Sequence, residues 1–203
     1  MNLIERAKNI IVAPAREWDV IATEQPDTAK IITGYVLPLA AAAALASFIG
    51  WSLIGSGSGI FRVSGMDFGL YYALRVLVGA ILGVFISALV IDNLAPSFGS
   101  EKNMPRSVQL VSYAYTPAWV GGLLSIFPVL ALIGALAGLY GLYLLYLGLP
   151  KIKKTPEDKH VGYFVVSLIV IIVVTIIIGL IMDRVVMRAM GLSYGLGDIR
   201  IKY

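Results

Sequence analysis

Five long apolar segments follow one another along this chain, and they leave few folds open to it. About 20 apolar residues in a helix cross the ~30 Å hydrocarbon core of a bilayer. The segments cover residues 31–54, 70–91, 107–126, 128–149 and 161–182. Only 14% of the 203 residues are charged, compared with about a quarter in soluble domains. The sequence therefore predicts an all-α polytopic membrane protein, a bundle of five transmembrane helices.

The segments outside the spans have distinct patterns. Near the N-terminus, apolar residues share one helical face: Leu3, Ile4, Ala7, Ile10 and Ile11. This spacing predicts an interfacial amphipathic helix that ends at Pro14, within a cytosolic segment 1–30. We expect Trp18 to anchor this segment at the membrane interface. Residues 31–182 form the predicted membrane domain, and 183–203 form an outer C-terminal tail.

The distribution of positive charge predicts the orientation. With the N-terminus inside, ten of the 16 lysines and arginines lie in cytosolic segments and five in outer segments. Positive charge is enriched on the cytosolic side of membrane proteins. We therefore expect a multi-pass protein of a prokaryotic plasma (inner) membrane, with a cytosolic N-terminus and an outer C-terminus.

The third span contains a stretch of polar residues and a proline, SYAYTPAW. The candidate intramembrane polar site is Gln109, Ser112, Tyr113, Tyr115, Thr116 and Pro117. Pro117 has no N–H, so it leaves the carbonyl of Tyr113 free and predicts a kink. Thr116, a neighbouring helix or a water could satisfy that carbonyl. The stripe is either a packing device between helices or a site for a solute or ion.

Three charged residues lie in or beside the spans. Arg75, inside the second span, either reaches the outer headgroups or pairs with Asp183, with Asp67 as the rival partner. Asp92 ends the same span, where a carboxylate opposes the helix dipole. We expect it to form a structural pair or cap, to have a role with cations or protons, or to be a solvated loop residue. The candidate partners are Lys151, Lys153 and Arg106.

Clusters of basic and of small residues suggest contacts outside the bundle. Lys151, Lys153 and Lys154 form either a site for anionic lipid headgroups or a solvated loop. Small residues four apart permit close helix approach. They predict a homo-oligomer or a membrane-protein partner, and they are Gly79, Gly83 and Ser87 on the second span and Gly134 and Gly138 on the fourth.

The sequence lacks the residues that several kinds of catalytic and metal-binding site require. The chain has no cysteine and one histidine, His160, and we find no metal-ligand cluster, cofactor motif or nucleophile with a nearby base. The basic residues flank spans rather than form one patch, so we expect no nucleic-acid binding. We expect no enzyme, no cofactor and no metal.

Two stretches resemble the prokaryotic branch of the Yip domain family of five-span membrane proteins. They are SYAYTPAWVGGLLSIFP, with Tyr113, Tyr115 and Pro117, and LYGLYLLYLGLPKIKKTPEDK. The resemblance implies a five-helix bundle with a cytosolic N-terminus. Eukaryotic members of the family interact with Rab GTPases and have a longer N-terminal region than residues 1–30 here. We therefore do not expect GTPase binding.

Two functional hypotheses follow. The first is a non-catalytic membrane-organising scaffold or adaptor, which predicts polar stripes buried between helices. The alternative is a small channel or transporter for an ion or small solute. It predicts a hydrated cavity beside Ser112, Thr116 and the Tyr113 carbonyl, with Asp92 at its cytosolic mouth.

Overall fold

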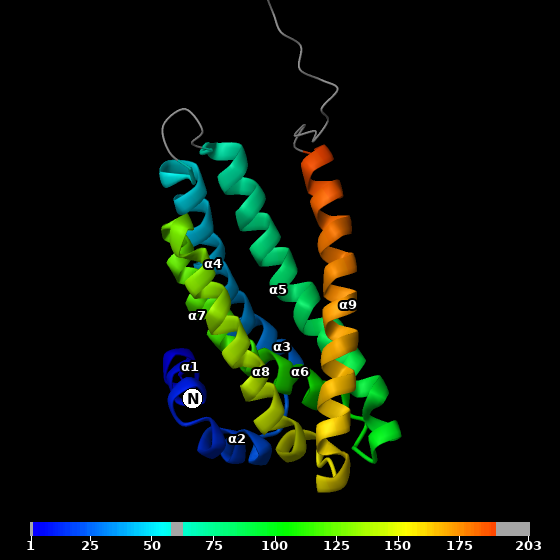
Figure 1. Ribbon diagram of the computed structural model, residues 1–203. Helices are drawn as coiled ribbons and strands as arrows, with labels where there is room; N and C mark the ends of the chain where they lie inside the picture. Colours follow the sequence, from blue (N-terminus) through cyan, green and yellow to red (C-terminus); the bar gives the residue numbers. More distant parts are fainter. Residues whose placement is uncertain (1, 58–62, 190–203) are drawn as a thin grey trace, which may run out of the picture.

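A computed structural model describes residues 2–57 and 63–189, and these residues form an all-helical bundle (Figure 1). Two helices precede the bundle, α1 (Leu3–Val12) and α2 (Pro14–Thr23). The remaining elements are α3 (Thr28–Ile31), η1 (Ile32–Val36), α4 (Leu37–Ile49), η2 (Gly50–Ile54), α5 (Met66–Leu94), η4 (Ala95–Phe98), α6 (Met104–Ala114), α7 (Thr116–Gly122), η5 (Leu123–Ile126), η6 (Pro128–Leu130), α8 (Ala131–Lys153) and α9 (Glu157–Ala189).

Four helical segments in the described part of the chain are long and apolar enough to cross a membrane. They are Thr28–Ile54, Met66–Phe98, Pro128–Lys153 and Glu157–Val185. Each contains one of the predicted spans. The last has the highest mean hydropathy of the four, 3.4, and many of its apolar side chains are exposed, including Ile169, Ile176 and Leu180. The chain is therefore a membrane protein with several transmembrane-capable helices.

The remaining predicted span, 107–126, is not one continuous helix. It is divided at Tyr115 into α6 and α7 and ends in the 3₁₀ turn η5. The division follows from Pro117, whose ring and missing N–H disrupt the preceding helical turn. Every residue from Ser107 to Ala114 is buried, so α6 forms part of the core of the bundle rather than a lipid-facing surface.

Helices α1 and α2 lie across one end of the bundle (Figure 1). Helix α1 ends just before Pro14, as predicted. Ile10 is fully buried, whereas Ile4 on the same helix is 71% exposed, so part of the predicted lipid-facing surface packs on the protein itself. Trp18 is fully buried as well, close enough to Gly148 of α8 that a Cβ there would touch its ring. The prediction that Trp18 is an interfacial anchor was therefore wrong.

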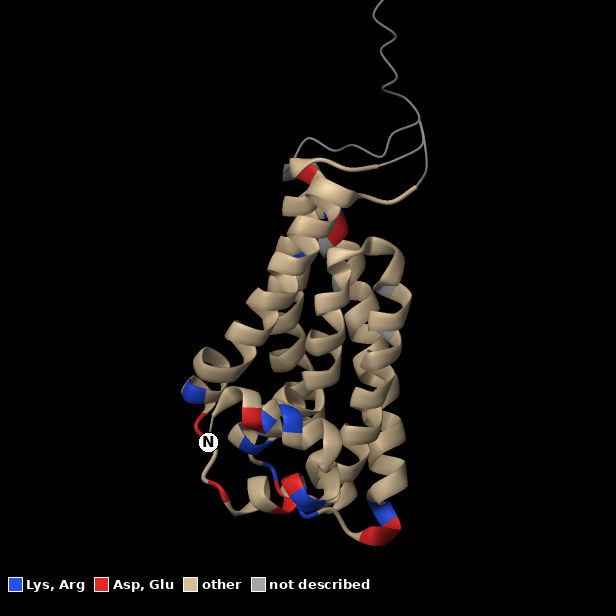
Figure 2. Ribbon diagram, turned by 90° about the vertical axis from the view of Figure 1, so that its left-hand side faces the viewer, with Lys and Arg blue, Asp and Glu red and all other residues tan. Residues whose placement is uncertain are grey.

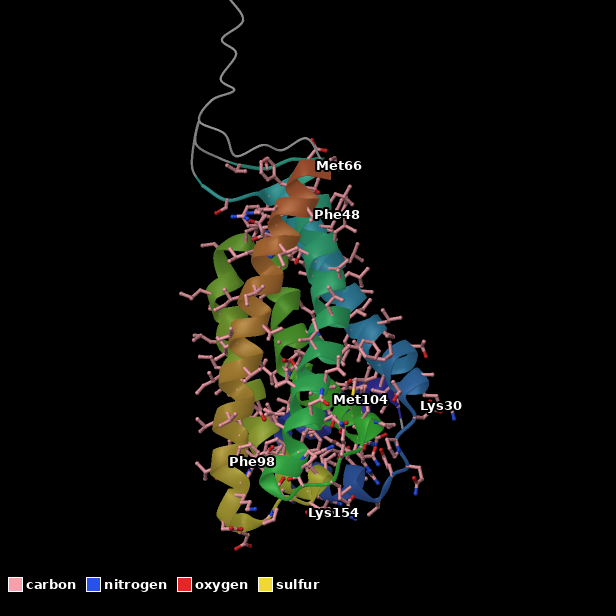
Figure 3. All side chains as sticks on the ribbon, turned by 90° about the vertical axis from the view of Figure 1, so that its right-hand side faces the viewer. Lys30, Phe48, Met66, Phe98, Met104 and Lys154 are labelled. Carbon is pink, nitrogen blue, oxygen red and sulfur yellow. The ribbon has the colours of Figure 1, made fainter. Side chains whose placement is uncertain are left out.

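The two ends of the bundle differ in polarity. We call the end that carries α1, α2, η4 and the α8–α9 turn the N-terminal end, and the end that carries Phe48, Met66 and Asp183 the opposite end. Figure 3 shows Lys30, Phe98, Met104 and Lys154 toward the first and Phe48 and Met66 toward the second. Most of the charged residues gather at the N-terminal end, and the middle of the bundle carries almost none (Figure 2).

The predicted boundary at residue 183 is not a break in structure, since α9 continues to Ala189. Most of the predicted outer tail, residues 190–203, and part of the glycine-rich loop after η2 lie outside the described residues.

Candidate functional site

The break in the third segment is closed by hydrogen bonds from side chains. Pro117 cannot donate to the Tyr113 carbonyl, and the Thr116 hydroxyl donates to it instead at 2.7 Å. A hydroxyl has one hydrogen, so the Tyr35 hydroxyl, 2.7 Å from Thr116 Oγ1, is the donor in that contact. Thr116 is fully buried. The carbonyl that the sequence predicted to be free is thus satisfied within the protein.

The other polar residues of SYAYTPAW have different surroundings. Tyr115 points toward α5, where its hydroxyl lies 2.6 Å from Ser87 Oγ. Ser112 is fully buried, and its hydroxyl has no partner among the described residues. The ring of Tyr113 packs edge-on against Tyr35, with ring centroids 4.8 Å apart. The predicted site therefore divides into a buried face toward Tyr35 of η1 and a separate contact with α5.

Asp92 lies in a buried polar cluster at the N-terminal end. Its Oδ1 accepts from Lys153 Nζ at 2.8 Å, from the Asn103 backbone at 2.7 Å and from Ser107 Oγ at 3.0 Å. Lys153 has no exposed side-chain surface. Its ammonium also lies 2.8 Å from Ser107 Oγ and 3.2 Å from the Asn103 carbonyl, so each of its three protons has an acceptor.

This cluster changes one of the sequence-based predictions. Lys153 is too buried to bind lipid headgroups, so that expectation was wrong for this residue. Burying an ammonium requires a paired charge, and Asp92 supplies it. The sequence named Lys153 as one of three possible partners, but it gave no indication of Asn103 or Ser107, which the α5–α6 turn brings beside Asp92.

The two neighbouring lysines remain at the surface. Lys151 donates to Asp19 and to the Ala15 carbonyl of α2. Lys154 donates to Glu101 at 2.8 Å, and its side chain is 70% exposed. Lys154 also has a positive φ of 51°, a left-handed residue that ends α8.

A second buried charge cluster was missed by the sequence reading. Arg6 of α1 is 5% exposed; it bonds to Glu17 at 2.7 Å and to Glu24. Its guanidinium also lies over the Tyr113 ring, 5.2 Å from the centroid, within the range of a cation–π contact. These partners come from separate helices, and no local spacing in the sequence indicates that they meet.

A cavity of about 420 Å³ opens beside this cluster. Arg6, Gln109 and Tyr113 contribute to its wall, and the α2–α3 connection and the start of the first span complete it. The full lining is Leu3, Arg6, Glu24, Gln25, Asp27, Lys30, Ile31, Gly34, Tyr35, Gln109 and Tyr113. Neither Ser112 nor Thr116 lines it, so the cavity ends at the two tyrosine rings.

At the opposite end, Arg75 and Asp183 are neighbours. Arg75 Nε lies 3.4 Å from Asp183 Oδ1, and the Tyr71 hydroxyl donates to the same oxygen at 2.8 Å. Arg75 also ends a groove of about 190 Å³ between α5 and α9. The groove is lined by Arg75, Gly79, Leu82, Gly83, Ile86, Thr175 and Gly179.

The small residues proposed as partner contacts are used in different ways. A Cβ on Gly134 would lie 2.7 Å from the Gly121 carbonyl, and one on Gly138 would lie 3.8 Å from Ala118. These two glycines therefore pack α8 on α7 inside the chain. Gly79 has no atom within 4 Å of an added Cβ, so it remains open toward the α5–α9 groove.

Within residues 2–57 and 63–189, no three His, Asp or Glu side chains gather closely enough to hold a metal ion. The ionisable residues that do cluster are joined in cation–carboxylate pairs, such as Lys153 with Asp92.

Comparison with known sequences identifies the family. The Yip1 domain matches residues 8–179. The inner membrane protein YohC of Escherichia coli strain K12 is 27% identical over 155 residues, which cover 74% of this chain and 80% of YohC. YohC of Escherichia coli O6:H1 matches to the same extent. No solved structure matches the chain. The family match includes both stretches that carried the resemblance, and the chain therefore belongs to the Yip1 domain family of membrane proteins.

Proposed function

We propose that the protein is a non-catalytic scaffold or adaptor that organises the membrane or a membrane-protein complex. The observation that carries this proposal is the hydrogen bonding of the third segment. Thr116 satisfies the Tyr113 carbonyl at 2.7 Å, and Tyr35 in turn bonds to Thr116. A conduction element needs polar groups that are free to replace the hydration shell of an ion, and here the Thr116 hydroxyl and the Tyr113 carbonyl are bonded to each other.

The buried charges support the same proposal. Asp92 is 6% exposed and bonds to Lys153, so a cation would have to displace a buried ammonium to reach it. Breaking a buried ion pair is strongly unfavourable. In this proposal the Asp92 cluster fixes the α5–α6 turn against the end of α8, and it makes that end of the bundle rigid.

The groove between α5 and α9 is the proposed contact surface for a partner helix or a second copy of the chain. Gly79 and Gly83 line it, and small residues let helix backbones approach closely in a membrane. Lys151 and Lys154 at the N-terminal end are proposed to contact anionic headgroups. The relatives named as inner membrane proteins support the same location here. In this proposal the N-terminus is in the cytosol, because more of the lysines and arginines then lie in cytosolic segments.

One observation favours the alternative function of a channel or transporter. The 420 Å³ cavity reaches Gln109 and Tyr113, two residues of the predicted intramembrane site. Transport would require the tyrosine barrier formed by Tyr35 and Tyr113 to open toward Ser112. The two functions therefore differ in whether solutes pass this barrier.

Flux through proteoliposomes tests the proposal directly. Uptake of protons and of mono- and divalent cations is measured for the wild type, Asp92→Asn and Thr116→Val. The scaffold proposal expects no flux above that of empty liposomes, although the protein is folded and inserted. Flux that depends on either residue would refute it and would make the broken third segment a conduction element.

Site-specific photo-crosslinking in native membranes tests the contact surface. A photoreactive residue at Gly79 or Ile86, in the groove, is expected to capture one defined protein partner or a second copy. The matched control positions are Leu132 and Leu139 on α8, which are 73% and 60% exposed but lie outside the groove. Equal labelling at groove and control positions would indicate random lipid-phase collisions and contradict a defined contact there.

A further inference from the structure

The cavity at the N-terminal end is lined by two polar groups that have no hydrogen-bond partner among the described residues. Gln109 is 1% exposed, and its side-chain oxygen accepts a hydrogen bond from Arg106, whereas no described residue accepts from its amide nitrogen. The hydroxyl of Tyr113, a residue that is 7% exposed, has no partner among the described residues either. Both residues line the cavity. The amide N–H and the hydroxyl can both donate, so this pair points to a ligand that accepts hydrogen bonds.

The charges around the cavity have both signs. Arg6 and Lys30 contribute two cations to the lining, and Glu24 and Asp27 contribute two carboxylates. Arg6 pairs with Glu24 and Lys30 pairs with Asp27, so the two signs balance and the wall favours neither an anion nor a cation alone. A zwitterion, with its two charges a few bonds apart, is complementary to both kinds.

The polar groups of the cavity wall lie at two different depths in the bundle. Gln109 and Tyr113 belong to α6, inside the bundle, whereas Glu24 and Asp27 belong to the α2–α3 connection at its end. The deeper wall therefore offers hydrogen-bond donors to an anion. The outer wall offers carboxylates to a cation.

The cavity reaches the exposed surface of the first span. Gly34 lines it, is exposed, and has no atom within 4 Å of an added Cβ. Gly34 lies six positions after Thr28, where the apolar helical segment begins, which at 1.5 Å per residue is roughly 9 Å. For this inference we place the membrane boundary near Thr28, at the end of the span where Lys30 lies (Figure 3), so that Gly34 lies close to the level at which headgroups meet acyl chains.

From these observations we infer that the cavity binds a phospho-amine zwitterion, as found in the headgroup of an ethanolamine phospholipid. The phosphate accepts from Gln109 and Tyr113, and the ammonium lies between Glu24 and Asp27. For a lipid, the acyl chains leave past Gly34 into the bilayer. The volume of about 420 Å³ is within the usual range for small-ligand sites. This inference does not depend on the scaffold proposal.

The first test compares ligands on the purified full-length protein in detergent. Native mass spectrometry titrations use dihexanoyl phosphatidylethanolamine, dihexanoyl phosphatidylglycerol and water-soluble glycerophosphoethanolamine. The ethanolamine lipid is expected to bind about tenfold more tightly than the glycerol lipid, because only it carries an ammonium for the carboxylates. Equal affinity for the two lipids would overturn the inference.

The soluble ligand separates the two possible sources of this chemistry. Weaker binding of glycerophosphoethanolamine than of the lipid would support a membrane-derived ligand. Gly34→Leu should then weaken lipid binding and leave soluble binding unchanged. Thr33→Leu places the same side chain at an exposed neighbour that does not line the cavity, and it should change neither. Equal binding of both ligands, unaffected by Gly34→Leu, would keep the phospho-amine site and overturn the lipid exit.

Two conservative variants test the assigned contacts. Tyr113→Phe keeps the ring packing and removes the hydroxyl, and it should weaken ethanolamine-lipid binding about tenfold. Tyr143→Phe is the matched control, since this exposed tyrosine lies on α8 away from the cavity. Unchanged binding by Tyr113→Phe would overturn the assignment.

Asp27→Asn keeps the test decisive if Tyr113→Phe does not fold. Asparagine caps a helix as well as aspartate does, so α3 should retain its N-cap bond from the Lys30 amide. Loss of one carboxylate should reduce the preference for the ethanolamine lipid over the glycerol lipid. An unchanged preference would remove Asp27 from the site and contradict the zwitterion.

Discussion

Each end of the bundle holds an ion pair, but the two pairs differ in how far they are buried. At the N-terminal end, Lys153 and Asp92 are buried together, and backbone and hydroxyl groups complete their hydrogen bonds. At the opposite end, Arg75 and Asp183 lie 3.4 Å apart, and their side chains are 48% and 35% exposed. The first pair joins three segments of the chain, whereas the second joins only α5 and α9.

The difference indicates which of the two ion pairs can be rearranged at low cost. A buried pair with all its bonds made cannot be rearranged without leaving a charge uncompensated. A half-exposed pair can exchange partners with water or headgroups at little cost. The α5–α9 groove begins at the second pair, so the surface proposed to meet a partner lies beside the more exposed of the two pairs.

The largest expected effect comes from removing the buried ammonium. Lys153→Met keeps most of the side-chain volume but leaves Asp92 buried without its cation, and it should lower the free energy of unfolding by about 3–5 kcal/mol. The measurement is unfolding of the purified protein in mixed micelles with increasing SDS. The double variant Lys153→Met with Asp92→Asn leaves no lone charge and should recover part of the loss. A cost below that of Arg75→Met would reverse the comparison.

Close glycine packing gives the next effect. In Gly121→Ala the new Cβ would lie 2.8 Å from the Gly134 carbonyl oxygen and 2.6 Å from Ala137 Cβ. Such overpacking should cost about 1–3 kcal/mol, measured in the same unfolding assay. Gly79→Ala is the matched control, since its Cβ meets open space, and it should be neutral or slightly stabilising. Similar losses for both variants would show that the close contacts with Gly134 and Ala137 do not decide the result.

The hydrogen-bonded break at Tyr115 should give an effect of similar or smaller size. Thr116→Val keeps the shape but removes the donor to the Tyr113 carbonyl and the acceptor for the Tyr35 hydroxyl. The expected loss is about 1–3 kcal/mol in unfolding free energy. Thr116→Ser retains the hydroxyl and should preserve most of the stability. Equal losses for serine and valine would mean that the hydroxyl alone does not account for the effect.

The sequence predicted features that depend on local chemistry. The apolar segments gave the helices, and Pro117 gave the break in the third one, because a missing N–H acts within one turn. Thr116 was named as one way to satisfy the freed carbonyl for the same reason. The Yip family resemblance was also confirmed, since its two stretches are contiguous in the chain.

Features that depend on how distant segments meet were missed. Arg6 reaches Glu17, Glu24 and Tyr113 only because α2 folds back across the end of the bundle. Trp18 was expected at the interface, since an aromatic beside charged residues is typical of that location, but its packing on Gly148 buries it. Lys153 looked like its neighbours Lys151 and Lys154, and only the position of Asp92 distinguishes it.

The smallest expected effect, and the closest test of the comparison, is Arg75→Met at the opposite end. The guanidinium is half exposed and 3.4 Å from Asp183, so its loss should change the unfolding free energy by less than about 1 kcal/mol. Added salt should reduce even this difference, because exposed charges are screened, whereas the loss caused by Lys153→Met should persist. The assay is the same unfolding series at low and high salt. A large, salt-independent loss for Arg75→Met would mean that α9 is held as firmly as the N-terminal end, and the groove could then not open to accept a partner.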